Sequence, residues 1–530
     1  MLYATPFTPQ LMESCMYEPY RHLDSIDFSR PENVQAMQDA LQSVQTDLGH
    51  EYDLIIGGKR VKGKGTFPSY NPAKKTEVIG NFQKARAEQI DAALEAGWDA
   101  FEEWSRFTPE ARAAIFMRAA ARMKERRFEL AAWQVYEEGK NWMEADGDVV
   151  EAIDFQEYYA RQAIRYGRGK PMAAFPGESN EYVYVPLGTG AVIPPWNFPL
   201  AIMSGMTAAA AVSGNCVVLK PSPDSPAMAA KYVEILEEVG LPSGVVNFIT
   251  GEDDVIGDPL VSHPKTRFIA FTGSQAVGLH INELAAKHQP GQKWVKRVIA
   301  EMGGKDAQIV LADADPDQAA EAAVTGAYGF QGQKCSACSR LIVEESVHDD
   351  LLDKIIERTK SITVGPTTEQ KHWMGPLINQ KAQDKVLKYI DIGKKEGQLV
   401  LGGNRINDQG YFVECTIFDQ VRPGARIEQE EIFGPVLSVI TARDYDQALE
   451  IANDTDYGLT GGVFTRDQRN IERAKREFHV GNLYFNRKIT GSLVGIQPFG
   501  GFNLSGTDSK AGGPDYLLYF LQPKTITHRL

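Results

Sequence analysis

Residues 330–340 read FQGQKCSACSR and hold two of the chain's five cysteines, three positions apart. A single CxxC could be a dithiol redox pair or half of a zinc site, but structural zinc needs four ligands, and neither a second CxxC nor a histidine pair at ligand spacing follows. Cys338 is interpreted as a small buried hydrophobe, the usual fate of a free cysteine. Around Cys335 small residues leave room for a substrate, and Lys334 would lower the pKa of its thiol. We therefore predict one reactive thiolate, at Cys335, and no metal site.

A second pattern, FTGSQAVG, could hold phosphate. It places Gly273 and Ser274 at a strand-to-helix turn and Gly278 in the first turns of the helix, where free N–H groups can face a pyrophosphate. Lys220 ends the strand CVVLK, at the edge where ligands of open α/β sheets bind. No GxGxxG opens a helix after the first strand, so a dinucleotide would have to bind without the usual fingerprint.

Composition narrows the class of protein. The chain of 530 residues is 43% hydrophobic and 24% charged, enough for more than one domain. Its net charge of -14 argues against a nucleic-acid partner, because binding to phosphates requires a basic face. We expect no membrane partner and no export, since we find neither a run of about eighteen apolar residues nor a basic leader. Five cysteines, an odd and sparse set, favour reduced thiols in a cytoplasmic protein.

The hydrophobic periodicity predicts an α/β fold. About the first fifty residues are polar and are expected to be an irregular, peripheral extension, with a small hairpin region next, in residues 52–72. Apolar residues repeat at three and four in residues 87–104 and 109–133, which predicts helices. From Gly188 short apolar strands alternate with helix-length segments, which predicts a parallel, doubly wound sheet. A second alternating series after Glu301 predicts a second α/β domain.

Two segments lie outside both series and are expected to be extended strands, residues 169–186 and 515–530. Apolar strands left at the periphery often pair with another subunit. We therefore expect a homodimer or a higher homo-oligomer.

Seven motifs have an informative order and spacing: PPWNFP at 194–199, VVLKPS at 217–222, FTGS followed by Gly278, EMGGK at 301–305, GQKC at 332–335, EEIFGPV at 430–436 and PFGGFNLSG at 498–506. In this order they resemble the aldehyde dehydrogenase superfamily, from about residue 55 to the end. The resemblance implies a Rossmann-type cofactor domain, a second α/β catalytic domain and a small β oligomerisation arm. The implied boundaries are 1–167 with 187–300, then 301–505, and 168–186 with 506–530 for the arm.

The resemblance also implies roles for three catalytic residues. An aldehyde gives up hydride only after a nucleophile has made its carbon tetrahedral, and the Cys335 thiolate is expected to do this. The amide of Asn197 and the backbone N–H of Cys335 would hold the resulting oxyanion. Glu301, 34 residues before the thiol (335 − 301), would activate the water that cleaves the thioester, and its position near an apolar strand predicts a raised pKa.

For the cofactor the resemblance implies NAD, with NADP possible. Glu431 would hold the nicotinamide ribose and Phe433 would pack beside it. The other expected contacts are Pro195, Trp196, Lys220, Ser222, Gly273, Ser274 and Gly278. Three residues after Lys220, many NAD-preferring members carry a glutamate that binds the adenosine ribose, and this chain has Pro223. Without that acid, repulsion of a 2′-phosphate is reduced.

The stretches KCSACSR and NRKITGSLVGIQPFGGFNLSGT resemble the branch of the superfamily that oxidises L-glutamate γ-semialdehyde to L-glutamate in proline degradation. Glu151 would meet the substrate's ammonium group. The residues expected to bind the substrate's carboxylate are Lys334, Ser336, Gly491 and Ser492. Those expected to pack along its aliphatic part are Phe198 and Phe499. The alternatives are another carboxylate-bearing aldehyde such as succinate semialdehyde, a CoA-acylating enzyme, and a non-catalytic binding protein with the same fold.

Overall fold

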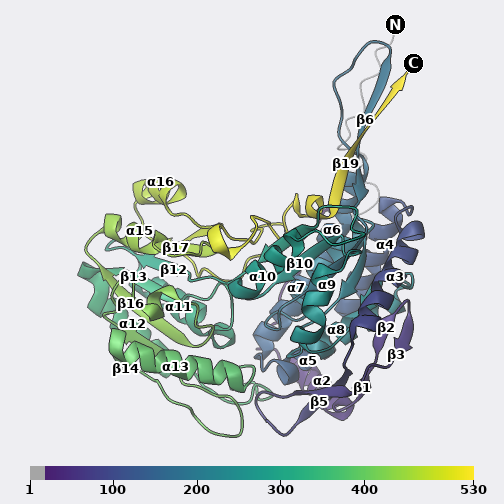
Figure 1. Cartoon of the computed structure of the whole chain (residues 1–530). Helices are drawn as coiled ribbons and strands as arrows, with labels where there is room; N and C mark the ends of the chain where they lie inside the picture. The colour runs from purple at the N-terminus through teal and green to yellow at the C-terminus, as the bar shows by residue number, and fades with distance from the viewer. Residues whose placement is uncertain (1–17) are drawn as a thin grey trace.

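The computed structural model describes residues 18–530. It contains two seven-stranded sheets, a three-stranded sheet and a two-stranded arm (Figure 1). No helix among the described residues is long and apolar enough to cross a membrane.

The first seven-stranded sheet has a parallel centre. Its strands, in spatial order, are β11 (Arg297–Glu301), β10 (Phe268–Thr272), β7 (Thr189–Ile193), β8 (Cys216–Leu219), β9 (Val246–Phe248), β2 (Leu54–Ile56) and β3 (Lys59–Val61). The five strands from β11 to β9 are parallel, as the alternating pattern predicts, and the predicted hairpin is present as the antiparallel pair β2–β3. Strand order reverses between β7 and β10, and in open α/β sheets such a reversal opens a crevice at the carboxyl ends.

Helices cover both faces of this sheet. One face packs on α3 (Ala87–Trp104), α9 (Asp253–Ser262) and α10 (Gln275–Ala286). The largest cluster of buried apolar side chains lies on the other face, among α4 (Pro109–Glu125), α5 (Arg127–Glu137), α6 (Trp142–Gly167), α7 (Ala201–Val212) and α8 (Pro226–Glu238).

The helix predicted over residues 109–133 is two helices. The break is at Arg126, whose φ of -96° and ψ of 17° leave the helical region. The side chain of Arg126 binds the carboxylates of Glu129 in α5 at 2.7 Å and of Glu238 at the end of α8 at 3.0 Å. Apolar periodicity continues through the break because α4 and α5 pack on the same core, so the sequence pattern did not show it.

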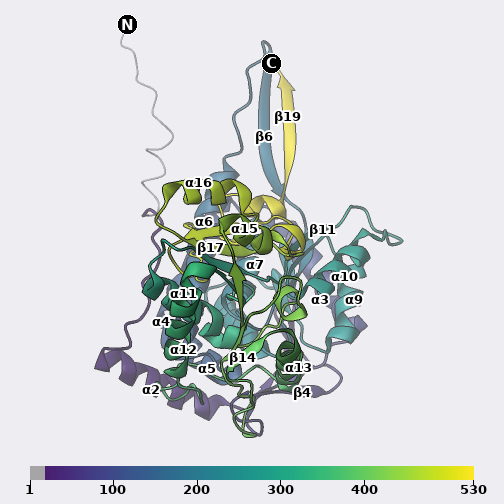
Figure 2. The ribbon, with the colours of Figure 1, turned by 90° about the vertical axis from the view of Figure 1, so that its left-hand side faces the viewer.

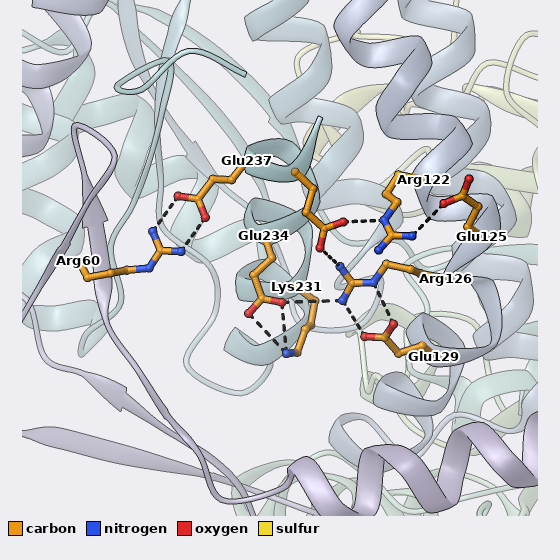
Figure 3. A network of polar contacts seen from close by, with 9 residues as sticks. Arg60, Arg122, Glu125, Arg126, Glu129, Lys231, Glu234 and Glu237 are labelled. Carbon is orange, nitrogen blue, oxygen red and sulfur yellow. Dashed lines mark hydrogen bonds and ion pairs between the residues drawn. The ribbon is translucent and has the colours of Figure 1, made fainter. Parts of the chain in front are cut away.

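Figure 3 shows the ionic network to which Arg126 belongs. Arg122 also reaches Glu238, at 2.6 Å, and Arg60 of β3 makes two hydrogen bonds to Glu237 at 2.6 and 2.7 Å. The network therefore joins α4, α5 and β3 to the last turn of α8. Each exposed pair stabilises the fold little by itself.

The expectation of an irregular N-terminal extension is wrong for residues 31–47. They form α2 (Pro31–Asp47), with Pro31 in the first turn and Met37, Leu41 and Val44 buried against α5. These three residues repeat at four and three, so one narrow stripe is apolar and the rest of the helix is polar. Beside α2 lie the short strands β1 (Glu51–Tyr52), β4 (Thr66–Tyr70) and β5 (Val78–Gln83).

The second seven-stranded sheet is also mainly parallel. Its order is β14 (Gln398–Leu401), β15 (Thr416–Asp419), β16 (Val436–Ala442), β13 (Arg340–Glu344), β12 (Ala307–Val310), β17 (Thr460–Phe464) and β18 (Asn482–Phe485), with only β14 antiparallel to its neighbour. One face packs on α11 (Pro316–Tyr328) and α12 (His348–Lys360). The other packs on α13 (Gln380–Glu396), α15 (Tyr445–Asn453) and α16 (Gln468–Glu477), and α14 (Arg426–Gln429) is a single turn.

The arm projects from the body of the molecule (Figures 1 and 2). It is the antiparallel pair of β6 (Glu178–Pro186) and β19 (Leu521–Arg529), both of which lie in segments predicted to be extended. At its base, Arg297 of β11 donates to three backbone carbonyls, of Leu518 at 3.0 Å, Tyr519 at 2.6 Å and Leu521 at 2.9 Å. The division of the chain into domains stays a prediction, and its boundary at 300 and 301 falls at the last residue of β11.

Candidate active site

The loop that carries Cys335 starts with an unusual turn. After α11 ends at Tyr328, Phe330 and Gln331 have φ values of 47° and 59°, in the left-handed region, followed by Gly332 at 67°. Non-glycine residues adopt this region at a cost and remain there only when their surroundings hold them. Gln331 provides such a hold, because its side chain is buried and Nε2 donates to the carbonyl of Pro376 at 2.8 Å.

The turn delivers Cys335 to a cavity of about 470 Å³. Glu301 lines the same cavity, so the predicted nucleophile and the predicted base face one space. All seven residues predicted to bind substrate also line it: Glu151, Phe198, Lys334, Ser336, Gly491, Ser492 and Phe499. Cys338, by contrast, is 1% exposed and packs in the core beneath the second sheet, as predicted.

The predicted effect of Lys334 on the thiol is wrong. Burial, followed by the carboxylates of Asp306, Glu431 and Glu301, raises the pKa of the Cys335 thiol well above its ordinary value. The Lys334 ammonium is engaged elsewhere, with Nζ 2.6 and 2.7 Å from the two carboxylate oxygens of Glu144. Because its charge is neutralised by Glu144, Lys334 does not favour the thiolate.

Glu301 is the last residue of β11 and is 7% exposed. Burial raises the pKa of its carboxyl group to about 8, against the opposing hydrogen bond from the Ser509 hydroxyl to Oε1. The predicted raised pKa is thus confirmed. In the described part of the chain Oε2 has no hydrogen-bond partner, which leaves one oxygen able to accept a proton from water.

Asn197 lies on the turn between β7 and α7, next to the thiol loop. Its side-chain Nδ2 donates to the backbone carbonyl of Gln333 at 3.0 Å, two residues before Cys335. An amide nitrogen carries two hydrogens, so the second is available to an oxyanion. Gln333 is itself held, because its Oε1 accepts the N–H of Ile378 at 2.9 Å.

The EMGGK motif shapes the space between the thiol loop and Glu431. Gly304 N–H donates to Oε1 of Glu431 at 3.1 Å. A Cβ on Gly303 would lie 2.5 Å from that same oxygen, and one on Gly304 would lie 2.5 Å from the carbonyl of Cys335. Two glycines are therefore required for Glu431 and the thiol loop to approach this strand end so closely.

The residues predicted to bind cofactor gather around the point where strand order reverses. Pro195 and Trp196 follow β7, and Gly273 and Ser274 follow β10. The Ser274 hydroxyl accepts the N–H of Val277 and so caps α10, whose buried Gly278 lies in the first turns. This end of α10 offers N–H groups to an anion.

Lys220 and Ser222 come directly after the neighbouring strand β8. Lys220 is 3% exposed, and its Nζ lies 2.5 Å from the carboxylate of Asp253, a residue not predicted from the sequence. On the opposite side Phe433, with a φ of 59°, packs edge-on to Trp196 at 5.5 Å between ring centroids. The donor set of cation, helix N-terminus, carboxylate and aromatic side chains fits a dinucleotide.

Sequence reasoning missed several residues of the cavity. Glu144 and His22 line it, and Lys140, which is fully buried, lies just behind it. Lys140 Nζ lies 2.7 Å from Asp148 and sits over the ring of Phe198, 4.5 Å from its centroid. The run EEGKNW around Lys140 has the composition of the end of a surface helix, and only the observation that it follows the apolar run AAWQVY could have suggested burial.

A thiol and a carboxylate facing one cavity beside a dinucleotide-like edge define an oxidoreductase that works through a covalent thioester. A model described as the aldehyde dehydrogenase family matches residues 60–526, and the chain belongs to this family.

Its relatives narrow the class. The chain is 55% identical over 512 residues to the 1-pyrroline-5-carboxylate dehydrogenase of Geobacillus thermodenitrificans (strain NG80-2), covering 97% of this chain and 99% of that protein. It is 54% identical over 512 residues to 1-pyrroline-5-carboxylate dehydrogenase 2 of Bacillus subtilis (strain 168), with the same coverage. The solved structure of the Thermus enzyme of this name with bound NAD has a TM-score of 0.96, at 52% identity, over 97% of this chain and 100% of that chain.

Proposed function

We propose that this chain oxidises L-glutamate γ-semialdehyde, which is in equilibrium with 1-pyrroline-5-carboxylate, to L-glutamate with NAD⁺, in the second step of proline degradation. The observation that supports this most directly is the cavity. It brings together a thiol, a carboxylate of raised pKa and a set of polar groups suited to an amino acid.

The reaction begins at Cys335. Because the pKa of its thiol is raised, the group first loses its proton to solvent. The thiolate then adds to the aldehyde carbon and forms a thiohemiacetal, whose oxyanion accepts hydrogen bonds from Asn197 and from the Cys335 backbone N–H. Bound NAD⁺ supplies the acceptor for the hydride that leaves the tetrahedral carbon. Lys220, Glu431 and the N-terminus of α10 are the residues that would hold the dinucleotide.

Glu301 completes the cycle. After hydride loss a thioester joins the substrate to Cys335, and Glu301 takes a proton from the water that attacks its carbonyl carbon. The carbon–sulfur bond breaks, glutamate is released and the thiol is regenerated. With water as the acceptor the enzyme needs no CoA, and addition of CoA is expected to leave the rate unchanged.

Substrate choice follows from charges at the far end of the cavity. Glu151 on α6 is oriented toward the cavity and would bind the α-ammonium group. Residues 490–497, here called the substrate loop, would bind the α-carboxylate through Gly491 and Ser492, together with Ser336. Ser492 is fixed for this role, because its hydroxyl lies 2.6 Å from that of Tyr484.

We propose a preference for NAD over NADP despite the proline at position 223. The carboxylate of Asp253 lies beside Lys220, the residue expected at the adenosine ribose, and would repel a 2′-phosphate there.

We further propose that the β6–β19 arm mediates a homo-oligomer and that the enzyme is cytoplasmic. The exposed side chains of Met172 and Phe175, in the segment before β6, support a role for the arm in assembly.

A panel of aldehydes tests the proposal. Wild type is expected to oxidise glutamate γ-semialdehyde with a kcat/KM well above that for succinate semialdehyde, with NAD better than NADP. In Glu151→Gln the selectivity for the amino-acid substrate is expected to fall, while the rate with succinate semialdehyde is kept. Equal kcat/KM for the two aldehydes in wild type would favour the alternative, a dehydrogenase for other carboxylate-bearing aldehydes. No NADH formation with any aldehyde would favour a non-catalytic binding protein.

A further inference from the structure

Residues 18–28, here called the N-terminal segment, lead into α2 and lie along α6. Figure 2 shows this purple stretch running down to α2. Arg127 binds the carboxylate of Asp146 at 2.6 and 2.8 Å and also donates to a backbone carbonyl of the segment at 2.9 Å. The N–H of Ile26 donates to the same carboxylate at 2.8 Å. The path of the segment is therefore fixed by charged groups of α5 and α6.

The segment supports the substrate loop through Tyr20. The Tyr20 hydroxyl donates to the carbonyl of Val494 at 2.9 Å, and its ring packs edge-on to Tyr158, 5.2 Å away. A Cβ on Gly495 would lie 2.9 Å from the Tyr20 ring. Because Val494 is two residues from Ser492, Tyr20 fixes the stretch of backbone that faces the substrate carboxylate.

His22 reaches the cavity itself. His22 and Ser25 both line it, from a part of the chain more than a hundred residues before any predicted site residue. Nδ1 of His22 lies 2.5 Å from Oδ2 of Asp154, while Oδ1 accepts the N–H of Leu23 at 3.3 Å. The Asp154 side chain is 2% exposed and that of His22 is 25% exposed, so the histidine lies between the carboxylate and the opening.

Asp154 lies one turn after Glu151 on the same helix. Residues three apart in a helix share a face, and both of these line the cavity. Two further carboxylates of α6 line the cavity, and they are paired, Glu144 with Lys334 and Asp148 with Lys140. Asp154 is paired with His22, which leaves Glu151 as the α6 carboxylate of the cavity for which the described residues supply no ion pair.

We propose that the N-terminal segment is part of the substrate site and that His22 is a positioning residue, which acts through Asp154 to keep Glu151 available for the substrate's ammonium group. This inference rests on the proposed function and deepens it. The contact between His22 and Asp154 occupies the second carboxylate, so that a single free carboxylate, that of Glu151, is presented to a single ammonium.

The electrostatic consequence can be worked out from the surrounding charges. Burial, followed by Asp148 and Asp154, raises the pKa of Glu151 to about 8, while Lys140 and Lys334 lower it. Loss of the His22 side chain leaves the Asp154 carboxyl group without this partner, and the interaction with Asp154 that raises the pKa of Glu151 becomes stronger. Glu151 is then protonated over more of the neutral range and binds the ammonium less well. The other titratable groups nearby are Tyr20, Glu144, Glu157 and Lys488.

The test uses His22→Gln, Asp154→Asn and the double variant, with His280→Gln as the control. His280 makes an exposed pair with Asp258 at 3.0 Å on the surface. KM and kcat are measured for glutamate γ-semialdehyde and for succinate semialdehyde from pH 6 to 9, at saturating NAD. The ratio of variant to wild type at each pH cancels the pH dependence of the substrate's own cyclisation.

We expect His22→Gln to raise KM for glutamate γ-semialdehyde about tenfold at neutral pH, as a shift of one pKa unit would. The ratio of the variant's KM to that of wild type should fall as the pH rises past 8. The kcat for glutamate γ-semialdehyde, and both constants for succinate semialdehyde, should stay within about twofold of wild type. The double variant should restore KM, because the uncompensated carboxylate is gone, and His280→Gln should match wild type.

Several results would overturn the inference. One is an unchanged KM in His22→Gln, and another is an equal loss with both aldehydes that the double variant does not restore, since this would show a purely structural role. If wild type itself does not oxidise glutamate γ-semialdehyde, the proposed function fails first and this inference falls with it. Thermal unfolding of each variant separates lost folding from lost binding.

Discussion

In the substrate cavity, burial is the main influence on Glu151 and Glu301 and raises the pKa of each to about 8, whereas at the cofactor edge Lys220 and Glu431 are bonded to partners within the protein. Lys220 has the carboxylate of Asp253, and Glu431 has the N–H of Gly304. The first region holds two buried carboxyl groups that gain or lose a proton near pH 8. The second holds groups that already have partners and must share or exchange them when a dinucleotide binds.

This contrast suggests that the two regions respond differently to mutation. In the cavity, Cys335 and Glu301 are proposed to act on atoms that react, so their removal is expected to change the chemical step. Groups at the cofactor edge contribute binding that is partly offset by the protein contacts they give up, so their removal changes affinity and selectivity by smaller factors.

The largest effect is expected for Cys335→Ser. A serine hydroxyl is a much weaker nucleophile than a thiolate, so kcat should fall roughly 10⁴-fold or more and the pre-steady-state burst of NADH should disappear. Stopped-flow absorbance of NADH measures both. Cys338→Ala, at the other cysteine of the CxxC, should keep the burst, and if it abolished the burst instead the assignment of the nucleophile would be wrong.

Glu301→Gln should have the next largest effect. Without a base, thioester cleavage should slow by about 10² to 10⁴, while the first burst of NADH remains. In wild type the base must be ionised, and its pKa is raised to about 8, so the steady-state rate should increase as pH rises through 8. In Glu301→Gln this dependence should be absent. A pH–rate profile measures this, and an unchanged profile in the variant would contradict the assignment of the base.

Asp253→Asn tests the cofactor edge. It removes the carboxylate 2.5 Å from Lys220, which should weaken repulsion of a 2′-phosphate and free the ammonium to bind it. Because Asp253 is largely exposed, the effect is limited to about 1 kcal/mol, or a rise of about fivefold in kcat/KM for NADP relative to NAD. Asp254→Asn, next in the chain, is the control. A ratio of kcat/KM for NADP to that for NAD equal to the wild-type ratio would show that Asp253 does not contribute to the choice between the two cofactors.

Ser274→Ala should have the smallest effect. The hydroxyl caps α10, so its loss should lower the free energy of unfolding by about 1 kcal/mol, measured by urea titration. KM for NAD should rise by no more than about threefold, because backbone N–H groups rather than the hydroxyl face the anion. A much larger rise would mean that the cofactor edge depends on side chains as strongly as the cavity does.

The sequence predicted the elements and motifs well, and the contacts between distant segments poorly. The alternation of strands and helices predicted the parallel sheets, because buried strands and amphipathic helices are local patterns. The raised pKa of Glu301 was predicted from the apolar strand that precedes it. Lys334 was misjudged because its partner, Glu144, lies 190 positions away and leaves no local signal. The same holds for His22, which reaches the cavity from outside every motif.

Strand β11 links two parts of the enzyme that otherwise have little in common. Its first residue, Arg297, donates hydrogen bonds to three backbone carbonyls where the arm meets the body of the molecule. Its last residue, Glu301, is the proposed general base for thioester cleavage. Extended backbone spans these residues in only about 13 Å, at roughly 3.3 Å per residue. The strand that anchors the arm therefore also fixes the position of the Glu301 carboxyl group.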